Sequence, residues 1–273
     1  MSDVGELRYR AVLDALLSLR GAIEGERPPS HRALAYREGW SRGIAPRLDV
    51  WEPHERVTRR SVLLVHGGGF VVGARDMKPM RVLGSRLSAA GVTVGSIDYR
   101  LIFRGGRLAA SLADTRDALA YWRDRCARRG LDADGVTIVG LSAGATLSMI
   151  VAGEPSSRVR SVVSCFGLYE LDHLEGPLAA LLPRLLFESR DRARWAERSP
   201  RRATQPAVPT LLLHGTDDGL VPVAQARRLA EHRASLGLPT RLSIFEGAPH
   251  GFFNQTGEHA ERGIREILAH VLE

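Results

Sequence analysis

The chain alternates short, almost continuously apolar runs with longer stretches in which apolar residues recur every three or four positions. The first pattern is typical of strands that are buried on both faces, and the second is typical of amphipathic helices. Strands are expected at residues 48–51, 61–65, 92–97, 136–139, 161–166, 208–213 and 241–245, and helices at 80–90, 109–128, 142–152, 223–236 and 258–272. This alternation predicts an α/β fold with a mostly parallel central sheet that helices cover on both faces.

Two stretches stand outside the alternation. Residues 4–23 have the apolar spacing of an amphipathic helix and are followed by Pro28-Pro29, which predicts a lead-in helix. Residues 169–207 separate two predicted strands and carry a broad apolar face. Either this face packs against the core, or the segment forms a cap that excludes water from a site. We expect an N-terminal lead-in over residues 1–45, a catalytic domain over 46–273, and a cap insertion at about 169–207.

Charge and composition change this picture little. With 273 residues and 44% apolar content, the chain can bury one sizeable core. A formal charge of +7 favours nucleic acid or an anionic membrane as partner. However, Lys78 is the one lysine, and the arginines are scattered and interleaved with acidic residues. We therefore expect no nucleic-acid partner and no stable membrane insertion, while homodimer formation stays open.

The spacing of the cysteines indicates whether a metal or cofactor is expected, and the N-terminal residues indicate the cellular location. The two cysteines, Cys126 and Cys165, form no disulfide framework or metal-ligand pattern, so neither a metal nor a cofactor is expected. Residues 1–10 mix charge into every turn, unlike a secretory signal, and no apolar run is long enough to span a bilayer. The expectation is a cytoplasmic protein.

The pentapeptide Gly140-Leu141-Ser142-Ala143-Gly144 carries the first chemical signal, because it lies between a predicted strand and a predicted helix. A G-x-S-x-G at such a junction is typical of a nucleophile elbow, in which glycines allow a sharp turn that exposes the serine hydroxyl. By itself the pattern is weak in a chain with 28 glycines, where a structural serine in a turn is common. Its meaning depends on the motifs around it.

A glycine run and two polar loops supply that context. His66-Gly67-Gly68-Gly69-Phe70 follows the run 61–65, and three glycines leave backbone N–H groups open to an oxyanion, although a flexible turn is the alternative. Asp217 and Asp218 follow the run 208–213, and His250 follows the last predicted strand. Serine, acid and histidine in this order, each after a strand end, match the α/β-hydrolase arrangement and differ from the chymotrypsin and subtilisin orders.

The sequence points to one histidine as the base but leaves more than one carboxylate as the acid. Of the nine histidines, His66 belongs to the glycine loop and His214 ends a strand, whereas His250 alone occupies a short loop after the last predicted strand. Asp217 and Asp218 compete as the acid, since a shift of one residue decides which side chain points inward. Glu246, which precedes the loop of His250, is the third and least favoured candidate for the acid.

These motifs, together with Asp98-Tyr99-Arg100-Leu101 and His250-Gly251-Phe252, resemble the bacterial hormone-sensitive-lipase branch of α/β-hydrolase esterases over roughly residues 46–272. That resemblance implies an α/β-hydrolase fold with a small helical cap. Two positions depart from the family pattern. Ile102-Phe103-Arg104 stands where the family usually has Ala-Pro-Glu, and Leu141 stands where the residue before the nucleophile is usually Asp.

The resemblance also implies roles for individual residues. It makes Asp218 the acid of a Ser142, His250 and Asp218 triad and leaves Asp217 as a loop-stabilising carboxylate. Asp98-Tyr99-Arg100 is expected to support the glycine loop from beneath, with His66 propping its glycines. The implied oxyanion hole consists of the N–H groups of Gly68, Gly69 and Ala143. The implied substrate pocket includes Phe70, Leu141, Leu181, Leu185 and Phe187.

The function expected on this basis is hydrolysis of a small-molecule carboxylic ester of short to medium acyl chain, through an acyl-enzyme intermediate. An arylformamidase, a thioesterase or an acyl-aminopeptidase would use the same machinery, and the sequence does not separate them. A ligand-binding protein on a hydrolase scaffold is a different class. It is disfavoured because Ser142, Asp218 and His250 are all present.

Overall fold

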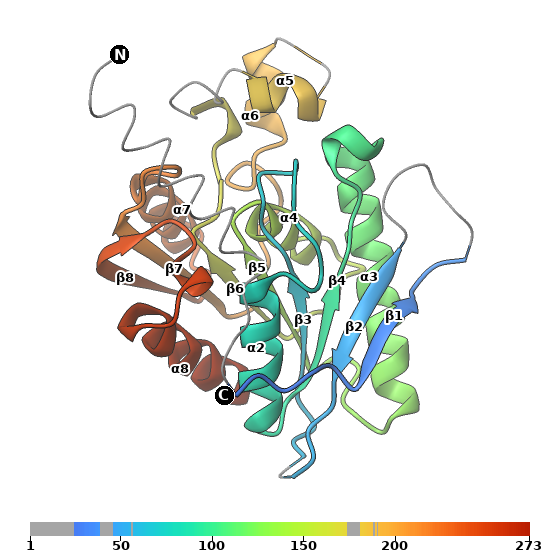
Figure 1. The fold of residues 1–273 in the computed structure, drawn as a ribbon. Coiled ribbons are helices and arrows are strands. Elements are labelled where there is room, and N and C mark those ends of the chain that lie inside the picture. The colour runs from blue at the N-terminus through green and yellow to red at the C-terminus, as the bar shows by residue number, and fades with distance from the viewer. Residues whose placement is uncertain (1–24, 39–45, 56, 174–180, 188, 190) are drawn as a thin grey trace.

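The sheet of this protein has eight strands in the order β1-β2-β4-β3-β5-β6-β7-β8 (Figure 1). The computed structural model describes residues 25–38, 46–55, 57–173, 181–187, 189 and 191–273, with the backbone alone for 181–183. Strand β2 pairs antiparallel with β1 and β4, and the remaining neighbours pair in parallel. The strands are β1 (His31–Ala35), β2 (Arg47–Trp51), β3 (Ser61–Val65), β4 (Thr93–Ile97), β5 (Val136–Leu141), β6 (Ser161–Cys165), β7 (Thr210–Asp217) and β8 (Thr240–Pro249).

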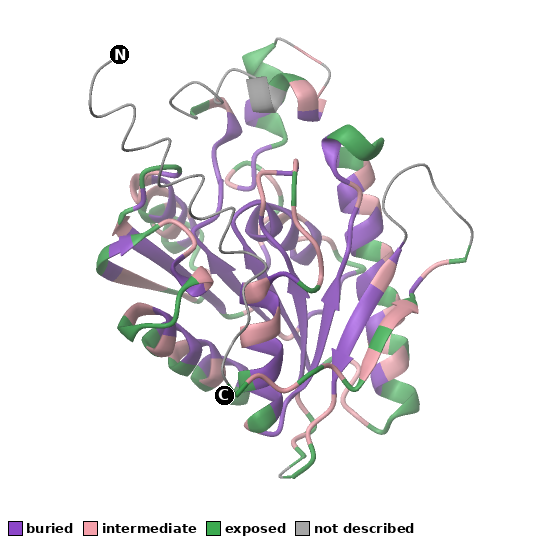
Figure 2. Cartoon of the chain, viewed as in Figure 1, coloured by how far each residue is buried: buried purple, intermediate pink, exposed green. Residues whose placement is uncertain are grey.

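Helices cover both faces of the sheet, and strands β2 to β7 form the buried centre of the molecule (Figure 2). One apolar cluster joins the sheet to α2 and α8, and a second joins it to α3, α4 and α7. The helices are α2 (Lys78–Ala89), α3 (Leu108–Arg128), α4 (Ala143–Ala152), α5 (Leu181–Phe187), α6 (Arg192–Glu197), α7 (Ala224–Ser235) and α8 (Glu258–Leu272). Single 3₁₀ turns are η2 (Ile102–Arg104), η3 (Leu171–His173) and η4 (Phe252–Asn254).

The α/β class expected from the apolar pattern is confirmed, and each expected strand and helix begins within two residues of its expected position. Strand β1 was not expected. Its five residues include a histidine and an arginine and are mostly half-buried, so its sequence carries no continuous apolar signal. It exists because β2 offers it an edge to pair with. The expected lead-in helix at residues 4–23 lies outside the described residues.

The register of the parallel strands brings their carboxyl ends to one edge. Val65 pairs with Gly140, Leu141 pairs with Cys165, and Cys165 pairs with Leu213. These pairings stand at or next to the last residues of β3, β5 and β6, and β7 continues beyond Leu213 to Asp217. The loops that follow β3, β5, β6, β7 and β8 therefore leave the sheet side by side, which is where ligands bind in open α/β sheets.

The described residues of segment 171–197, which form η3, α5 and α6, lie above this edge (Figure 1). Leu171 and Trp195 pack with Leu168 and Val221 in a small separate cluster. Leu186 of α5 is buried in the cluster on the α3 and α4 face. The described part of this segment thus rests on the molecule through apolar contacts.

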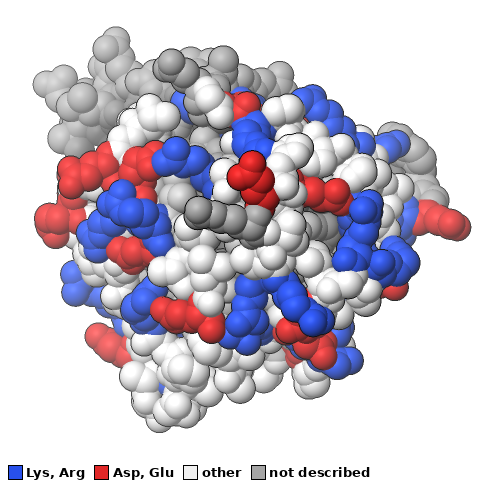
Figure 3. All heavy atoms as spheres, turned by 90° about the horizontal axis from the view of Figure 1, so that it is seen from below, with Lys and Arg blue, Asp and Glu red and all other residues white. Residues whose placement is uncertain are grey.

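Surface charge is mixed over the opposite end of the molecule. Basic and acidic side chains alternate across the face drawn in Figure 3, which carries part of the formal charge of +7. Among the described residues, no helix combines the length and the apolar character needed to cross a membrane.

Candidate active site

The turn between β5 and α4 holds Ser142 in a backbone conformation that favours glycine, with φ 51° and ψ −115°. Glycine is required around it. A Cβ on Gly140 would lie 2.4 Å from the Gly144 carbonyl oxygen, and a Cβ on Gly144 would lie 2.1 Å from the Val65 carbonyl oxygen. Strain at a single residue persists only where its surroundings enforce it. The two close approaches therefore fix Ser142 at the head of α4.

Ser142, His250 and Asp218 form one hydrogen-bonded line across three loops. His250 Nε2 lies 3.0 Å from Ser142 Oγ, and His250 Nδ1 lies 2.7 Å from Asp218 Oδ2. An ionised carboxylate only accepts, so Nδ1 carries the proton and Nε2 faces the hydroxyl as an acceptor. The arrangement can take a proton from Ser142 Oγ.

The Asp218 carboxylate is buried and fully engaged. Its Oδ1 accepts from the N–H groups of Leu220, at 2.9 Å, and Val221, at 2.7 Å. Burial alone raises a carboxyl pKa, but the donors from His214, His250 and Val221 outweigh that effect and hold the pKa of Asp218 well below its usual range. The carboxylate stays charged and so fixes the His250 tautomer.

The other two acid candidates lie elsewhere. Asp217 is exposed, and its Oδ1 accepts from the Thr216 hydroxyl at 3.3 Å. Glu246, also exposed, has its Oε1 3.3 Å from the same hydroxyl. The structure therefore places Asp218, and neither Asp217 nor Glu246, against His250.

The glycine loop after β3 lies against the serine turn. A Cβ on Gly67 would be 3.0 Å from the Leu141 carbonyl oxygen and 3.1 Å from Ser142 Cβ. Gly68 and Gly69 have φ of 112° and 62°, and within the described residues neither N–H donates to a protein acceptor. Ala143 begins α4, so its N–H has no partner inside the helix. These donors are available to a ligand beside Ser142.

Buried polar groups hold the loop from beneath. His66 donates from Nδ1 to the Gly67 carbonyl oxygen at 2.7 Å and stacks on Tyr99, with ring centroids 4.2 Å apart. The Tyr99 hydroxyl donates to the His66 carbonyl oxygen at 2.9 Å. Complete burial lowers the pKa of His66, so its ring is neutral. Asp98 Oδ1 accepts from the Arg75 backbone N–H at 2.9 Å and so fixes the segment that follows the glycine loop.

Arg100 does not share in this support. Its guanidinium donates to Asp114 of α3, with Nε 2.8 Å from Oδ2. Asp98 and Tyr99 therefore support the glycine loop, whereas Arg100 joins the end of the strand region to a helix.

Phe166, directly after β6, touches His250 and was expected only as the end of a strand. Its ring meets the His250 ring edge-on, with centroids 5.0 Å apart and planes at 67°, and packs on Phe252 at 5.3 Å. Its φ of 40° is unusual for a bulky residue. The available signal was its place after a strand that neighbours the serine strand.

The expected pocket residues divide between the two apolar clusters. Phe70 is buried in the cluster on the α3 and α4 face, and Leu185 and Phe187 pack partly buried against the same cluster. Leu141 belongs to the cluster on the α2 and α8 face. The side chain of Leu181 lies outside the described residues. The structure thus separates Leu141 from the other three.

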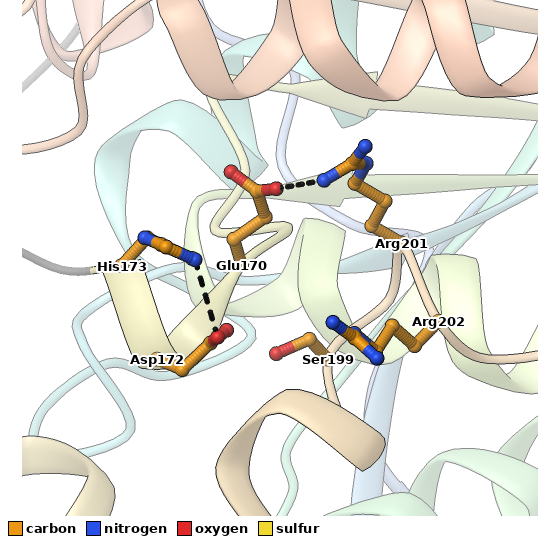
Figure 4. Close-up of a pocket in the computed structure, with 6 residues that line it drawn as sticks. All are labelled: Glu170, Asp172, His173, Ser199, Arg201 and Arg202. Carbon is orange, nitrogen blue, oxygen red and sulfur yellow. Dashed lines mark hydrogen bonds and ion pairs between the residues drawn. The ribbon is translucent and has the colours of Figure 1, made fainter. Parts of the chain in front are cut away.

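A hollow at the base of segment 171–197 is built from ion pairs (Figure 4). Buried Glu170 pairs with Arg201 and Arg228, and their charges outweigh its burial and lower the pKa of its carboxyl. His173 pairs with Asp172 at 3.3 Å. The lining residues are Glu170, Asp172, His173, Ser199, Arg201 and Arg202. None of them belongs to the line formed by Ser142, His250 and Asp218, so the hollow is separate from that line. Its ion pairs attach the segment to the rest of the molecule.

In the described part of the chain, no group of three or more histidine, cysteine, aspartate or glutamate side chains is arranged to hold a metal ion. Both cysteines are free and buried.

Comparison with known proteins gives one family match. The model of the family described as BD-FAE matches residues 48–232. Esterase LipC of Mycobacterium tuberculosis is 30% identical over 249 residues, which cover 81% of this chain and 61% of LipC. A probable isoprenylcysteine alpha-carbonyl methylesterase of Oryza sativa is 24% identical, over 75% of this chain and 55% of that protein. The chain thus spans between about half and three-fifths of these relatives.

Solved structures match over nearly the whole chain. A truncated carbohydrate esterase from gut microbiota superposes with a TM-score of 0.79 at 19% identity, covering 93% of this chain and 98% of that one. Thermogutta terrifontis esterase 2, phosphonylated by sarin, has a TM-score of 0.75 at 22% identity, covering 92% and 98%. At these identities the likeness is one of fold.

Proposed function

The chain belongs to the BD-FAE family and has the α/β-hydrolase fold, and from that premise we propose that it is a serine hydrolase of carboxylic esters. One observation carries the proposal: the unbroken line from Ser142 Oγ through His250 to the buried Asp218 carboxylate. Such a line activates a serine that is otherwise a poor nucleophile at neutral pH. The esterase names of its relatives agree with it.

The reaction begins when His250 Nε2 takes the proton of Ser142 as Oγ attacks the acyl carbon. The resulting oxyanion is held by the N–H groups of Gly68, Gly69 and Ala143, each donor lowering the barrier by ~3 kcal/mol. His250 then gives its proton to the leaving alcohol, which leaves an acyl group on Ser142. Water, activated by the same histidine, releases the acid.

The substrate is a small ester with a short to medium acyl chain. The proposed organisation is a catalytic domain from residue 46 onward with a cap insertion at about 169–207. Phe70, Leu185 and Phe187 share one apolar cluster and are proposed to bound the acyl pocket. Leu141 is left to the core, because its neighbours belong to the opposite face.

A panel of p-nitrophenyl esters of increasing chain length tests this proposal, run beside N-formylkynurenine and an acyl-CoA. We expect turnover of the esters with a maximum at short to medium chains. A fluorophosphonate probe should add once, at Ser142. Faster turnover of the formamide or thioester would replace the ester assignment, and labelling at another residue would reject the assigned nucleophile.

A further inference from the structure

Strand β7 carries a second buried histidine, His214, beneath the loop that holds Asp218. Its side chain is completely buried. His214 Nε2 donates to the Val221 carbonyl oxygen at 2.9 Å. The same nitrogen lies 3.1 Å from Asp218 Oδ2, the oxygen that accepts from His250. Both imidazoles therefore converge on one carboxylate oxygen.

The surroundings of His214 define its protonation. The two atoms facing Nε2 are a carbonyl oxygen and a carboxylate oxygen, which are acceptors, so Nε2 carries a proton. Nδ1 is buried without a partner. A second proton there would create a buried N–H with no acceptor, which is costly. The ring is the neutral Nε2–H tautomer, shared between Val221 and Asp218.

The Nε2 proton of His214 completes a ring of hydrogen bonds around the Asp218 carboxylate. Val221 donates its N–H to Asp218 Oδ1 at 2.7 Å and receives the His214 proton on its carbonyl oxygen. Leu220 also donates to Oδ1. Among the described residues, His214 and His250 are the titratable side chains that contact Asp218. Without His214, Oδ2 would keep His250 as its one side-chain donor.

We propose that His214 is a positioning residue for the hydrolytic reaction: its Nε2–H fixes the Asp218 carboxylate and the Val221 peptide so that Oδ2 faces His250. The proposal rests on the proposed function. When His250 gains the Ser142 proton, the new imidazolium pulls on Oδ2. A second donor on that oxygen lowers its basicity, so the Nδ1 proton stays on His250 and does not pass to Asp218, and it keeps the carboxylate from rotating.

Three variants separate this role from simple packing. In His214→Gln, the side-chain amide reaches about as far as Nε2 and still donates. In His214→Met, a side chain of similar length fills the space without a donor. His270→Met is the matched control, because His270 is also a buried histidine with an unpartnered Nε2 but lies on α8 and contacts no residue of the line. Each is assayed for kcat, KM and the pH profile on one p-nitrophenyl ester.

His214→Met should lower kcat by about ten- to a hundredfold, the factor that a hydrogen bond to a charged group is worth, with KM little changed. The acid limb of kcat/KM should move to higher pH, because the imidazolium would face a more concentrated negative charge. His214→Gln should recover most of both effects. His270→Met should lower the melting temperature alone. Equal losses in the Gln and Met variants, or wild-type kinetics in His214→Met, would overturn the proposal.

Two further experiments test the proposal if His214→Met does not fold or if turnover cannot be measured. If His214→Met does not fold, His214→Asn replaces it, because the Asn amide is too short to reach the position of Nε2; equal activity of Asn and Gln variants overturns the proposal. Histidine ring NMR of His250 in a Ser142→Ala background needs no turnover. There, the ionisation midpoint should rise in His214→Met, and an unchanged midpoint overturns it. If wild-type protein turns over no ester while the NMR shift appears, the proposed function fails and the His214 contact stands.

Discussion

The loops at the carboxyl ends of β5, β7 and β8 and the segment 171–197 above them are built by different means. In the loops, single atoms are placed by hydrogen bonds and by glycines that admit no Cβ, as at Gly140 and Gly144. In segment 171–197, short helices rest on apolar neighbours such as Leu168 and Val221 and on the ion pairs of Glu170.

The difference indicates where each property of the protein is encoded. A hydrogen bond between buried groups tolerates little displacement, so under the proposed function the residues that hold Ser142, His250 and Asp218 set the chemistry. Apolar packing accepts side chains of similar volume, so the proposed cap can change its contacts without loss of the proposed reaction. Changes in the loops should therefore act on kcat, and changes in the cap should act on the choice of substrate.

The strongest test of the first half of this comparison is Ser142→Ala. Turnover of esters should fall by at least about 10⁴-fold, because the nucleophile is lost while the oxyanion donors remain. The melting temperature should stay near that of the wild type, since alanine can occupy the same backbone conformation. Steady-state assays, phosphonate labelling and thermal unfolding measure these effects. Retained labelling in the variant would move the nucleophile to another residue.

A neighbouring pair of carboxylates gives the second test. Asp218→Asn should lower kcat by about a thousandfold or more, since the amide no longer fixes the His250 tautomer. Asp217→Asn should change kcat by less than about threefold, because the exposed Asp217 contacts Thr216 and not His250. The two variants differ by one position in the chain, so parallel kinetics measure the effect of the contact alone. The reverse ranking would assign the acid to Asp217.

The third test uses pH. Because hydrogen bonds hold the pKa of Asp218 below its usual range, this carboxylate stabilises the folded state fully above about pH 4, and the contribution is lost as pH falls further. The melting temperature of the wild type should therefore fall more steeply between pH 4 and pH 2 than that of Asp218→Asn. Activity should be lost at a higher pH than stability, because only a neutral His250 can accept the Ser142 proton. Coincident loss of activity and stability would contradict the separation.

The smallest expected effects belong to the cap. Leu185→Ala and Phe187→Ala should shift the preferred acyl chain length by a few carbons and cost less than ~2 kcal/mol of stability, because both side chains are partly exposed. Leu147→Ala in α4 is the core control and should cost ~2–5 kcal/mol. Chain-length profiles and denaturant unfolding measure the two quantities. Core-sized losses without a change in profile would show that these residues only pack.

Several parts of the fold followed from local pattern. The runs that became β3 and β5 are apolar at nearly every position, which is the mark of a strand buried on both faces, and their starts agree with the structure. Strand β1 could not be found in this way, because a half-buried edge strand needs only a neighbour to pair with. The ends of β7 and β8 were placed short, since the pairing of Asp217 with Pro249 continues beyond the apolar residues.

By itself, the sequence determined the order of strands and helices, the glycines around Ser142, and the short set of residues from which a nucleophile, a base and an acid could be drawn. Those features are local, because periodicity and missing side chains act within a few residues. The tertiary structure alone decided that Asp218 faces His250 while Asp217 faces solvent, that Phe166 packs on His250, and that Leu141 and Phe70 belong to different apolar clusters. It also placed His214 Nε2 against the Asp218 carboxylate. Ser142 and His250 are separated by 108 positions, and contacts across such distances depend on strand register and side-chain direction, which no local pattern contains.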